Sequence, residues 1–256
     1  MRARSSVVVL AVLGLGLAGC GDGSPAAGDD GAATVLDVYA AASLNDTFTQ
    51  LAEDFEAGHP GVEVALNFAG SSALVQQLTE GASADVLATA DERTMARAVD
   101  AALVEGEPEV FATNLLTVVV PADDPAGVTS LHDLEDPGVQ TVVCAPQVPC
   151  GAAIAQVTEA AGVSLSPVSE EGSVTDVLGK VTSGQADAGL VYATDARSAG
   201  DAVRTVGIPE ADRAVNRYPL AVLTGSDEQE LARQFAELVT GGTGRDVLAG
   251  AGFGAP

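Results

Sequence analysis

The sequence predicts an α/β fold for the chain from residue 34 onward, and two observations lead to this prediction. Apolar runs of strand length alternate with segments whose apolar residues recur at helical spacing, all along the chain. The run 115–120 is apolar enough to be buried on both faces of a sheet. Residues 34–256 are also numerous enough for one large domain or two small lobes with a sizeable core.

The first half of the globular part contains four expected strands and three expected helices. Gly58-His59-Pro60 ends the first helix, and Asp91 is placed to open the third. In chain order we expect a strand at 35–40, a helix at 44–56, strands at 62–67 and 86–88 flanking a helix at 73–80, a helix after residue 91, and a strand at 115–120.

The second half continues the alternation, and no internal repeat interrupts it. We expect a strand at 140–145, helices at 152–161 and 174–183, strands at 188–192 and 220–223, and two C-terminal helices. With no Trp and only 4% aromatic residues, Val, Leu and Ala must build the core.

Several expected strands end in a short turn directly before a helix. Ser43 lies in such a turn, Ser71 in another, and Val148-Pro149-Cys150-Gly151 forms a third. The free N–H groups of a helix start and its positive dipole end favour anions. Each serine could instead be a plain N-cap, since Ser43 is followed by Asp46 at capping-box spacing. Both roles are compatible, because a hydroxyl can accept one hydrogen bond and donate another.

The N-terminus predicts export and lipid attachment. Arg2 and Arg4 precede an apolar run at 7–18, which is too short to span a bilayer. Leu17-Ala18-Gly19-Cys20 resembles a bacterial lipobox, which implies a signal peptide at 1–20 and a lipid on Cys20. The alternative is an ordinary secretory signal. Residues 21–33 carry no large apolar side chain, so we expect a flexible linker.

Net charge and cysteine content limit the expected partners and the expected state of the cysteines. The formal net charge of −25 becomes −27 once the two arginines of the signal are lost, so nucleic acid is not an expected partner. With Cys20 assigned to lipid, Cys144 and Cys150 are expected to form a disulfide in an oxidising compartment. Two buried free thiols are the main alternative, and a zinc site is disfavoured because no nearby ligands complete it.

The chain resembles the bacterial molybdate-binding proteins, the extracytoplasmic receptors of molybdate ABC importers, over nearly all of residues 34–256. The matching segments are AAASL ending at residue 44, FAGSSAL from 68, GASADVLATAD from 81, VPCG from 148 and GLVYATDA from 189. The resemblance implies that an oxyanion is bound by five positions, Ser43, Ser71, Cys150, Val174 and Tyr192. Cys150 would contribute only its backbone N–H.

The resemblance also implies a two-lobed, type II periplasmic-binding-protein fold with the ligand cleft between the lobes. Lobe I would comprise 34–113 and 218–256, and lobe II 114–217. The implied partners are a membrane permease and its ATPase subunit, with the receptor monomeric, lipid-anchored on the extracytoplasmic face of the cell membrane, and without a cofactor. The chain departs from the family at Cys150, where Ala is common, and at Gly70, which replaces a serine and leaves open whether Ser71 or Ser72 is the main contact.

Donor groups suit molybdate, because this dianion carries no proton and can only accept hydrogen bonds. No cation needs to be buried, and Lys180 is the only lysine. Sulfate is the rival ligand, whereas protonated phosphate would favour an acceptor carboxylate, which none of the five positions supplies. Tungstate is nearly the same size and charge as molybdate, so the sequence does not separate the two.

Catalysis is the rival of a different class, with Ser43 or Ser71 as nucleophile and His59 or His132 as base. No G-x-S-x-G or S-x-x-K motif surrounds either serine, so no catalytic residue is expected. Tyr192 and Val174 each have an ordinary alternative as core residues.

Overall fold

The computed structural model describes residues 33–256, and these residues form one compact unit. The predicted signal peptide at 1–20, the lipid-bearing Cys20 and all but the last residue of the linker at 21–33 lie outside the described residues. Among those described, no helix has the length and apolar character needed to cross a membrane.

The first of two mixed five-stranded sheets has the strand order β2-β1-β3-β10-β4. Strand β1 pairs in parallel with β2 and β3, and β10 pairs antiparallel with β3 and β4. Its strands are β1 (Thr34–Ala41), β2 (Val62–Ala69), β3 (Val86–Ala88), β4 (Glu109–Asn114) and β10 (Asn216–Val222).

The second sheet has the order β7-β6-β8-β5-β9. Strand β6 pairs in parallel with β7 and β8, and β5 pairs antiparallel with β8 and β9. Its strands are β5 (Leu116–Pro121), β6 (Thr141–Cys144), β7 (Ser169–Glu171), β8 (Ala188–Tyr192) and β9 (Val203–Val206).

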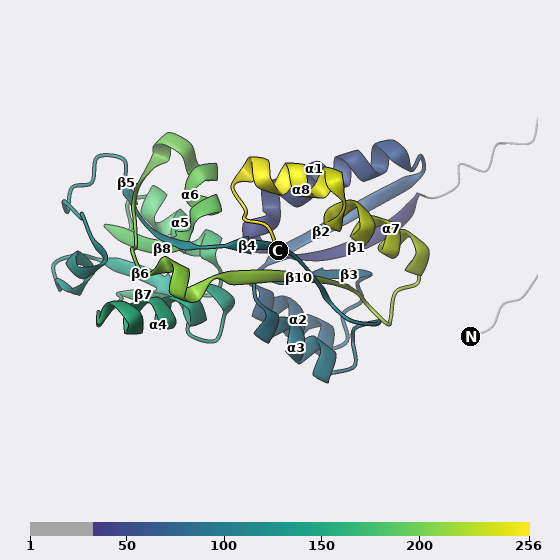
Figure 1. Ribbon diagram of the computed structural model, residues 1–256, viewed down its shortest axis with the longest axis horizontal. Coiled ribbons are helices and arrows are strands. Elements are labelled where there is room, and N and C mark those ends of the chain that lie inside the picture. Colours follow the sequence, from purple (N-terminus) through teal and green to yellow (C-terminus); the bar gives the residue numbers. More distant parts are fainter. Residues whose placement is uncertain (1–32) are drawn as a thin grey trace, which may run out of the picture. The chain divides into compact units, whose positions relative to one another are not determined.

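Helices cover both faces of each sheet (Figure 1). On the first sheet, α1 (Asn45–Gly58), α7 (Gln229–Thr240) and α8 (Gly242–Ala251) pack on one face, and α2 (Ser71–Thr79) and α3 (Glu92–Asp100) on the other. The second sheet carries α4 (Pro149–Ala161) on one face, and α5 (Val174–Thr182) and α6 (Ala193–Ala199) on the other. Four short 3₁₀ turns complete the described elements: η1 (Ala42–Leu44), η2 (Leu131–Glu135), η3 (Gly200–Ala202) and η4 (Ala211–Ala214).

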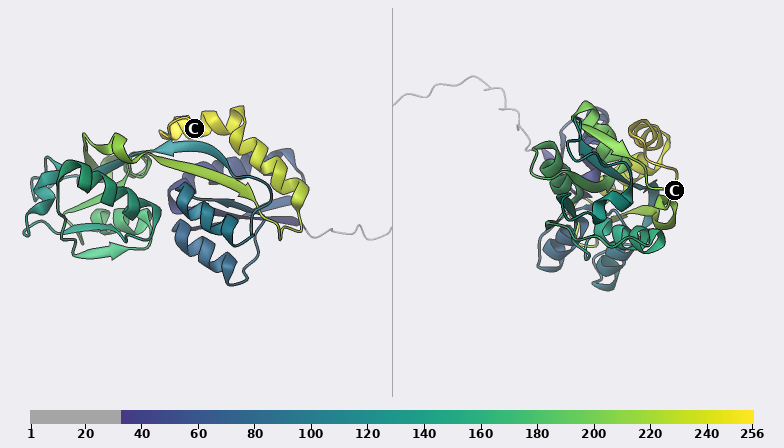
Figure 2. Two further views of the ribbon diagram at one scale, coloured as in Figure 1. Left: turned by 60° about the horizontal axis from the view of Figure 1, so that its bottom comes forward. Right: turned by 90° about the vertical axis from the view of Figure 1, so that its left-hand side faces the viewer.

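The chain passes between the sheets twice. The first passage is at Leu115, between β4 of the first sheet and β5 of the second, and the return lies between β9 and β10. Figure 2 shows β4 and β10 extending together toward the second sheet. The architecture is therefore the predicted two-lobed α/β fold, in which one lobe is built around each sheet.

The expected helices and strands are all present, and the additional strands all lie at the edges of the two sheets. Strand 115–120 is buried on both faces as predicted, since Leu116 to Val120 are all buried. The strands that the sequence did not predict, β4, β7 and β9, all lie at sheet edges. An edge strand has one neighbour only and tolerates polar side chains, so it lacks a continuous apolar run. The short helix α6 was also not predicted.

The core consists mainly of Val, Leu and Ala, as composition predicts. Several of the few aromatic residues nevertheless gather in one place in the first lobe. Phe48 contacts Phe111 and Phe235, and Tyr218 contacts Phe111 and Phe253 with ring centroids 6.4 and 5.4 Å apart. Tyr218 is fully buried and also packs edge-on against Tyr192 of the second lobe. Tyr218 of β10 therefore lies at a contact between the two lobes.

Candidate oxyanion site between the lobes

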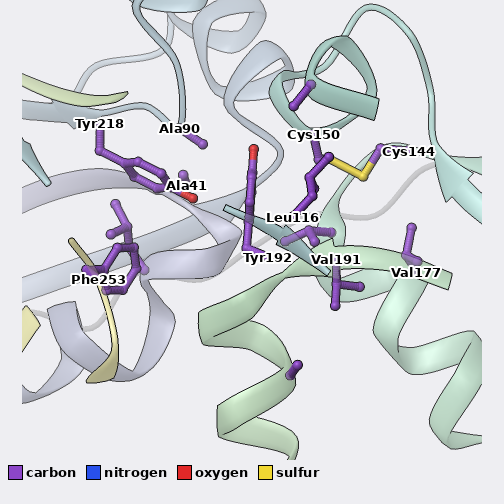
Figure 3. Packing of buried hydrophobic residues seen from close by; sticks show 14 of the residues in the cluster. Ala41, Ala90, Leu116, Cys144, Cys150, Val177, Val191, Tyr192, Tyr218 and Phe253 are labelled. Carbon is purple, nitrogen blue, oxygen red and sulfur yellow. A yellow bond between two sulfur atoms is a disulfide. The ribbon is translucent and has the colours of Figure 1, made fainter. Parts of the chain in front are cut away.

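All five positions implied by the family resemblance line one small cavity of about 20 Å³. Ser43 and Ser71 come from the first lobe, and Cys150, Val174 and Tyr192 from the second. Figure 3 shows the Tyr192 ring between Ala41 and Ala90 of the first lobe and Cys150 of the second. The structure therefore brings together residues up to 149 positions apart in the sequence, from Ser43 to Tyr192.

Each of the five residues lies at or after the carboxyl end of a strand in a parallel pair. Ser43 follows β1, Ser71 follows β2, Cys150 and Val174 follow β6 and β7, and Tyr192 is the last residue of β8. Ligands of open α/β sheets bind outside the carboxyl ends of their strands. The two sheets present these ends to the same cavity, which explains why the strand-turn-helix units converge there.

Three helices begin at the cavity, and their first N–H groups have no partner within the helix. Helices α2 and α4 begin after Gly70 and Val148, neither of which provides a side-chain cap. Helix α5 is capped by Ser173, whose hydroxyl accepts from the Asp176 N–H, so the cap leaves the N–H of Val174 available. Free N–H groups at positive dipole ends form an anion site.

The Tyr192 hydroxyl is buried and has no hydrogen-bond partner in the part of the chain that the structure describes. Burial raises the pKa of Tyr192 well above its usual value, and the nearby Tyr218, Asp195 and Asp91 raise it further. The hydroxyl therefore keeps its proton at all physiological pH values. A buried unpartnered donor costs free energy, so this hydroxyl fits a ligand that accepts a hydrogen bond.

The two serines at the start of α2 have different roles. The Ser71 hydroxyl oxygen accepts from the N–H of Ala90 at 3.0 Å, which leaves its own hydrogen free to point into the cavity. The Ser72 hydroxyl donates to the backbone oxygen of Gln147 in the second lobe at 2.9 Å. Ser72 is not among the cavity-lining residues. Its hydrogen is used for a bond between the lobes rather than for a ligand.

Ser43 does not cap a helix. Helix α1 begins after Leu44 without a side-chain cap, and the Ser43 hydroxyl lies 2.9 Å from the hydroxyl of Tyr218. Ser71 is likewise the first residue of α2 rather than its cap, so the alternative of a plain cap does not hold at either position. At Asp91 the predicted cap is confirmed, because its carboxylate accepts from the Thr94 N–H at 2.8 Å.

The predicted disulfide between Cys144 and Cys150 is present. It joins the end of β6 to the first turn of α4, and the chain between them forms the turn at the cavity (Figure 3). Both cysteines are buried. The described residues contain no group of three or more His, Cys, Asp and Glu side chains suited to a metal ion, so the zinc alternative has no ligand set there.

Gly70, where the family pattern has a serine, lies against the backbone of the second lobe. A Cβ atom at Gly70 would lie 2.1 Å from the backbone oxygen of Gly172 in the second lobe. A side chain cannot fit at this distance, because the nearest atom belongs to backbone. Gly70 therefore permits a closer approach of the lobes than any other residue would.

Among the residues that the structure describes, no charged side chain lines the cavity. A larger groove of about 400 Å³ shares Ala42 and Ser43 with it, but its lining includes Asp46 and Asp195 together with Arg197. Two carboxylates disfavour a small dianion, so the donor-rich cavity is the better candidate despite its size. Asp195 is a residue that sequence reasoning missed; it is buried behind Tyr192, whose N–H donates to its carboxylate at 3.0 Å.

Neither histidine is placed to activate a serine. The two ring nitrogens of His59 are hydrogen bonded to the backbone oxygen of Phe55 and the side chain of Gln234. His132 is exposed and pairs with Glu135. Neither lines the cavity that holds Ser43 and Ser71, so neither histidine is placed to act as a base for these serines.

Comparison with known proteins shows the family of this chain. Residues 36–254 match the family model described as bacterial extracellular solute-binding protein. The chain belongs to this family. The molybdate-binding protein ModA of Mycobacterium tuberculosis (strain ATCC 25618 / H37Rv) is 49% identical over 255 residues, 98% of each chain, which confirms the predicted resemblance to the molybdate-binding proteins.

Two solved structures share the fold. The periplasmic molybdate-binding protein of Azotobacter vinelandii superposes with a TM-score of 0.75 at 22% identity, over 86% of this chain and 99% of that one. The sulfate-binding protein SubI from Mycobacterium tuberculosis H37Rv superposes with a TM-score of 0.73 at 21% identity, over 86% of each chain. The family consists of solute-binding proteins and not of enzymes. The fold alone does not distinguish molybdate from sulfate.

Proposed function

We propose that this protein is an extracytoplasmic receptor that binds molybdate, or tungstate, between its lobes and delivers it to an ABC importer, without a cofactor. The observation that carries the proposal is the composition of the cavity. Ser43, Ser71, Tyr192 and the backbone N–H groups of Cys150 and Val174 are all donors, and no charged side chain of residues 33–256 lines the space. A fully deprotonated dianion accepts hydrogen bonds from every side and needs no acceptor in return.

Affinity then comes from short-range hydrogen bonds and not from long-range attraction. The net charge is −25 for the whole sequence, so the overall field repels a dianion. Hydrogen bonds to a charged acceptor are stronger than neutral ones, and a site that excludes water strengthens them further. Capture should consequently be slower than for receptors with a positive field.

Sulfate is the alternative ligand within the same class, because it is also a dianion that only accepts hydrogen bonds. The 49% identity to a named molybdate-binding protein favours molybdate. The fold favours neither ligand, because a molybdate-binding and a sulfate-binding protein both share it. Phosphate is disfavoured, since its remaining proton would face no carboxylate in the cavity lining.

The deciding experiment is calorimetric titration of the protein, produced from residue 33 onward, with molybdate, tungstate, sulfate and phosphate. We expect tight binding of molybdate and tungstate and weak or no binding of the other two. Tight binding of sulfate without binding of molybdate would replace the proposed ligand. Hydrolysis of generic ester substrates that disappears in Ser43→Ala would restore the enzyme alternative.

We further propose that the receptor is a monomer tethered by a lipid on Cys20, with lobe I at 34–113 and 218–256 and lobe II at 114–217. The support is the lipobox-like Leu17-Ala18-Gly19-Cys20 and the two passages of the chain between the sheets. Expression of the full chain in a bacterial host should place it in the membrane fraction, and Cys20→Ser should release it. A Cys20→Ser variant that stays in the membrane fraction would contradict the tether.

A further inference from the structure

Four polar side chains form a buried chain of hydrogen bonds beside the cavity, where β4 and β10 leave the first lobe. They are Ser43 of η1, Tyr218 of β10, Asn114 of β4 and Thr194 of α6. Asn114, Thr194 and Tyr218 are buried, and Ser43 is partly buried. Only Ser43 lines the cavity. The other three side chains can therefore act on a bound ligand only through Ser43.

The orientation of the Asn114 amide is fixed by its neighbours. Its oxygen accepts from the N–H of Leu115 at 3.0 Å. Its nitrogen is therefore directed the other way, where it donates to the Thr194 hydroxyl at 2.7 Å and, over a longer distance of 3.5 Å, to the Tyr218 hydroxyl. An amide nitrogen has two hydrogens and no acceptor capacity. Toward Tyr218, Asn114 is thus a donor only.

The direction of the next hydrogen bond follows from this. The Tyr218 hydroxyl has one hydrogen to donate, and Asn114 cannot receive it. The hydroxyl of Ser43, 2.9 Å away, can accept it. Burial raises the pKa of Tyr218 far above its usual value, so the hydrogen is retained at all physiological pH values. With its oxygen accepting from Tyr218, the Ser43 hydroxyl has its own hydrogen free for the cavity.

We infer that Tyr218, oriented by Asn114, is a positioning residue that makes Ser43 a hydrogen-bond donor to the bound oxyanion. The inference rests on the proposed function, because it assigns a role within the same site. The donors run in one direction from Asn114 through Tyr218 to Ser43, and hydrogen bonds in such a chain strengthen one another. Without Tyr218, the serine hydroxyl is free to turn its hydrogen toward other acceptors.

The test is a double-mutant cycle with molybdate binding measured by calorimetry. Tyr218→Phe removes one oxygen and keeps the ring contacts with Phe111 and Phe253. We expect the Kd for molybdate to rise about tenfold, which corresponds to about 1.4 kcal/mol. The matched control is Tyr39→Phe, since Tyr39 lies on β1 and does not line the cavity; its Kd should not change.

The decisive measurement is the same substitution in a Ser43→Ala background. A positioning role predicts that Tyr218→Phe then causes no further loss, because there is no hydroxyl left to orient. A purely structural role predicts an equal loss in both backgrounds, and that result would overturn the inference, as would an unchanged Kd in Tyr218→Phe alone. Circular dichroism checks that each variant is folded.

Asn114→Ala tests the same chain from its other end and keeps the inference falsifiable if Tyr218→Phe does not fold. It should raise the Kd by a smaller factor, and this rise should also vanish in the Ser43→Ala background; an undiminished rise contradicts the inference. A wild-type protein that binds no oxyanion would refute both the proposed function and the inference. A wild-type protein that binds molybdate with an additive cycle refutes the inference alone.

Discussion

The two lobes contribute different kinds of group to the same cavity. Besides the start of α2, the first lobe offers two serine hydroxyls, and in each case the hydroxyl oxygen already contacts a partner within its own lobe. The second lobe offers the starts of α4 and α5, whose donors are backbone N–H groups, and one side chain, Tyr192, without a partner. The first half of the site is therefore sensitive to single side-chain changes, whereas the second depends mostly on backbone shape.

The largest effect on affinity is expected where the lobes meet. In Gly70→Val, the new Cβ atom would lie 2.1 Å from the backbone oxygen of Gly172 in the second lobe. The lobes therefore cannot approach each other as closely as in the wild type. We expect molybdate binding to weaken by 100-fold or more, about 3 kcal/mol, measured by calorimetry. Gly58→Ala is the matched control, since nothing lies within 4 Å of a Cβ there. Wild-type affinity in Gly70→Val would show that close approach is not required.

The second lobe has one side chain whose removal should matter. Tyr192→Phe deletes a donor that has no partner of its own, so we expect loss of ligand affinity by about 1.5–3 kcal/mol without loss of stability. Calorimetry and thermal unfolding measure the two quantities. If Tyr192→Phe lost as much stability as ligand affinity, the hydroxyl would stabilise the fold rather than bind the ligand.

The serines of α2 distinguish cavity contact from contact between lobes. Ser71→Ala removes a cavity donor and should weaken binding by about 1–3 kcal/mol, and it also leaves the buried N–H of Ala90 unpaired. Ser72→Ala removes a single hydrogen bond to Gln147, and we expect about 0.5–1.5 kcal/mol. A larger effect on molybdate affinity for Ser72→Ala would reverse the assignment.

A smaller effect is expected from pH. Burial raises the pKa of Asp195 to about 7, partly offset by the hydrogen bond from the Tyr192 N–H. The carboxyl is charged above this pH and neutral below it, so acidification removes a negative charge from behind the site. We expect molybdate affinity to rise about twofold to fivefold between pH 8 and pH 6, and Asp195→Asn to remove this dependence. A molybdate affinity that falls on acidification would contradict this role of Asp195.

The disulfide should affect affinity least. Replacing Cys144 and Cys150 together by alanine removes a crosslink between residues that are 6 positions apart in the sequence. In the chain-entropy model this loss costs about 2 kcal/mol of stability. The proposed donor at position 150 is a backbone N–H and survives the change, so the Kd should shift by less than about threefold. Thermal unfolding and calorimetry measure the two. A loss of binding as large as that of Tyr192→Phe would mean that the disulfide holds the turn in shape.

The sequence predicted the central strands well because burial on both faces leaves a continuous apolar run, as at Leu116 to Val120. Edge strands such as β7, with the sequence Ser-Glu-Glu, leave no such signal. The five site positions came from family segments and from the turn chemistry of helix starts. Tyr218 and Asn114 could not be found this way, because their partners Ser43 and Thr194 lie at least 80 positions away in the sequence.

The use of backbone donors in the second lobe has an evolutionary consequence. A position that presents only its N–H to the ligand places few demands on its side chain, and substitutions there are close to neutral for binding. Such a position is free to acquire an unrelated task. Cys150 does so here, since it lines the cavity while its sulfur is bonded to Cys144. A structural crosslink could therefore arise inside a binding turn without an intermediate that had lost its ligand.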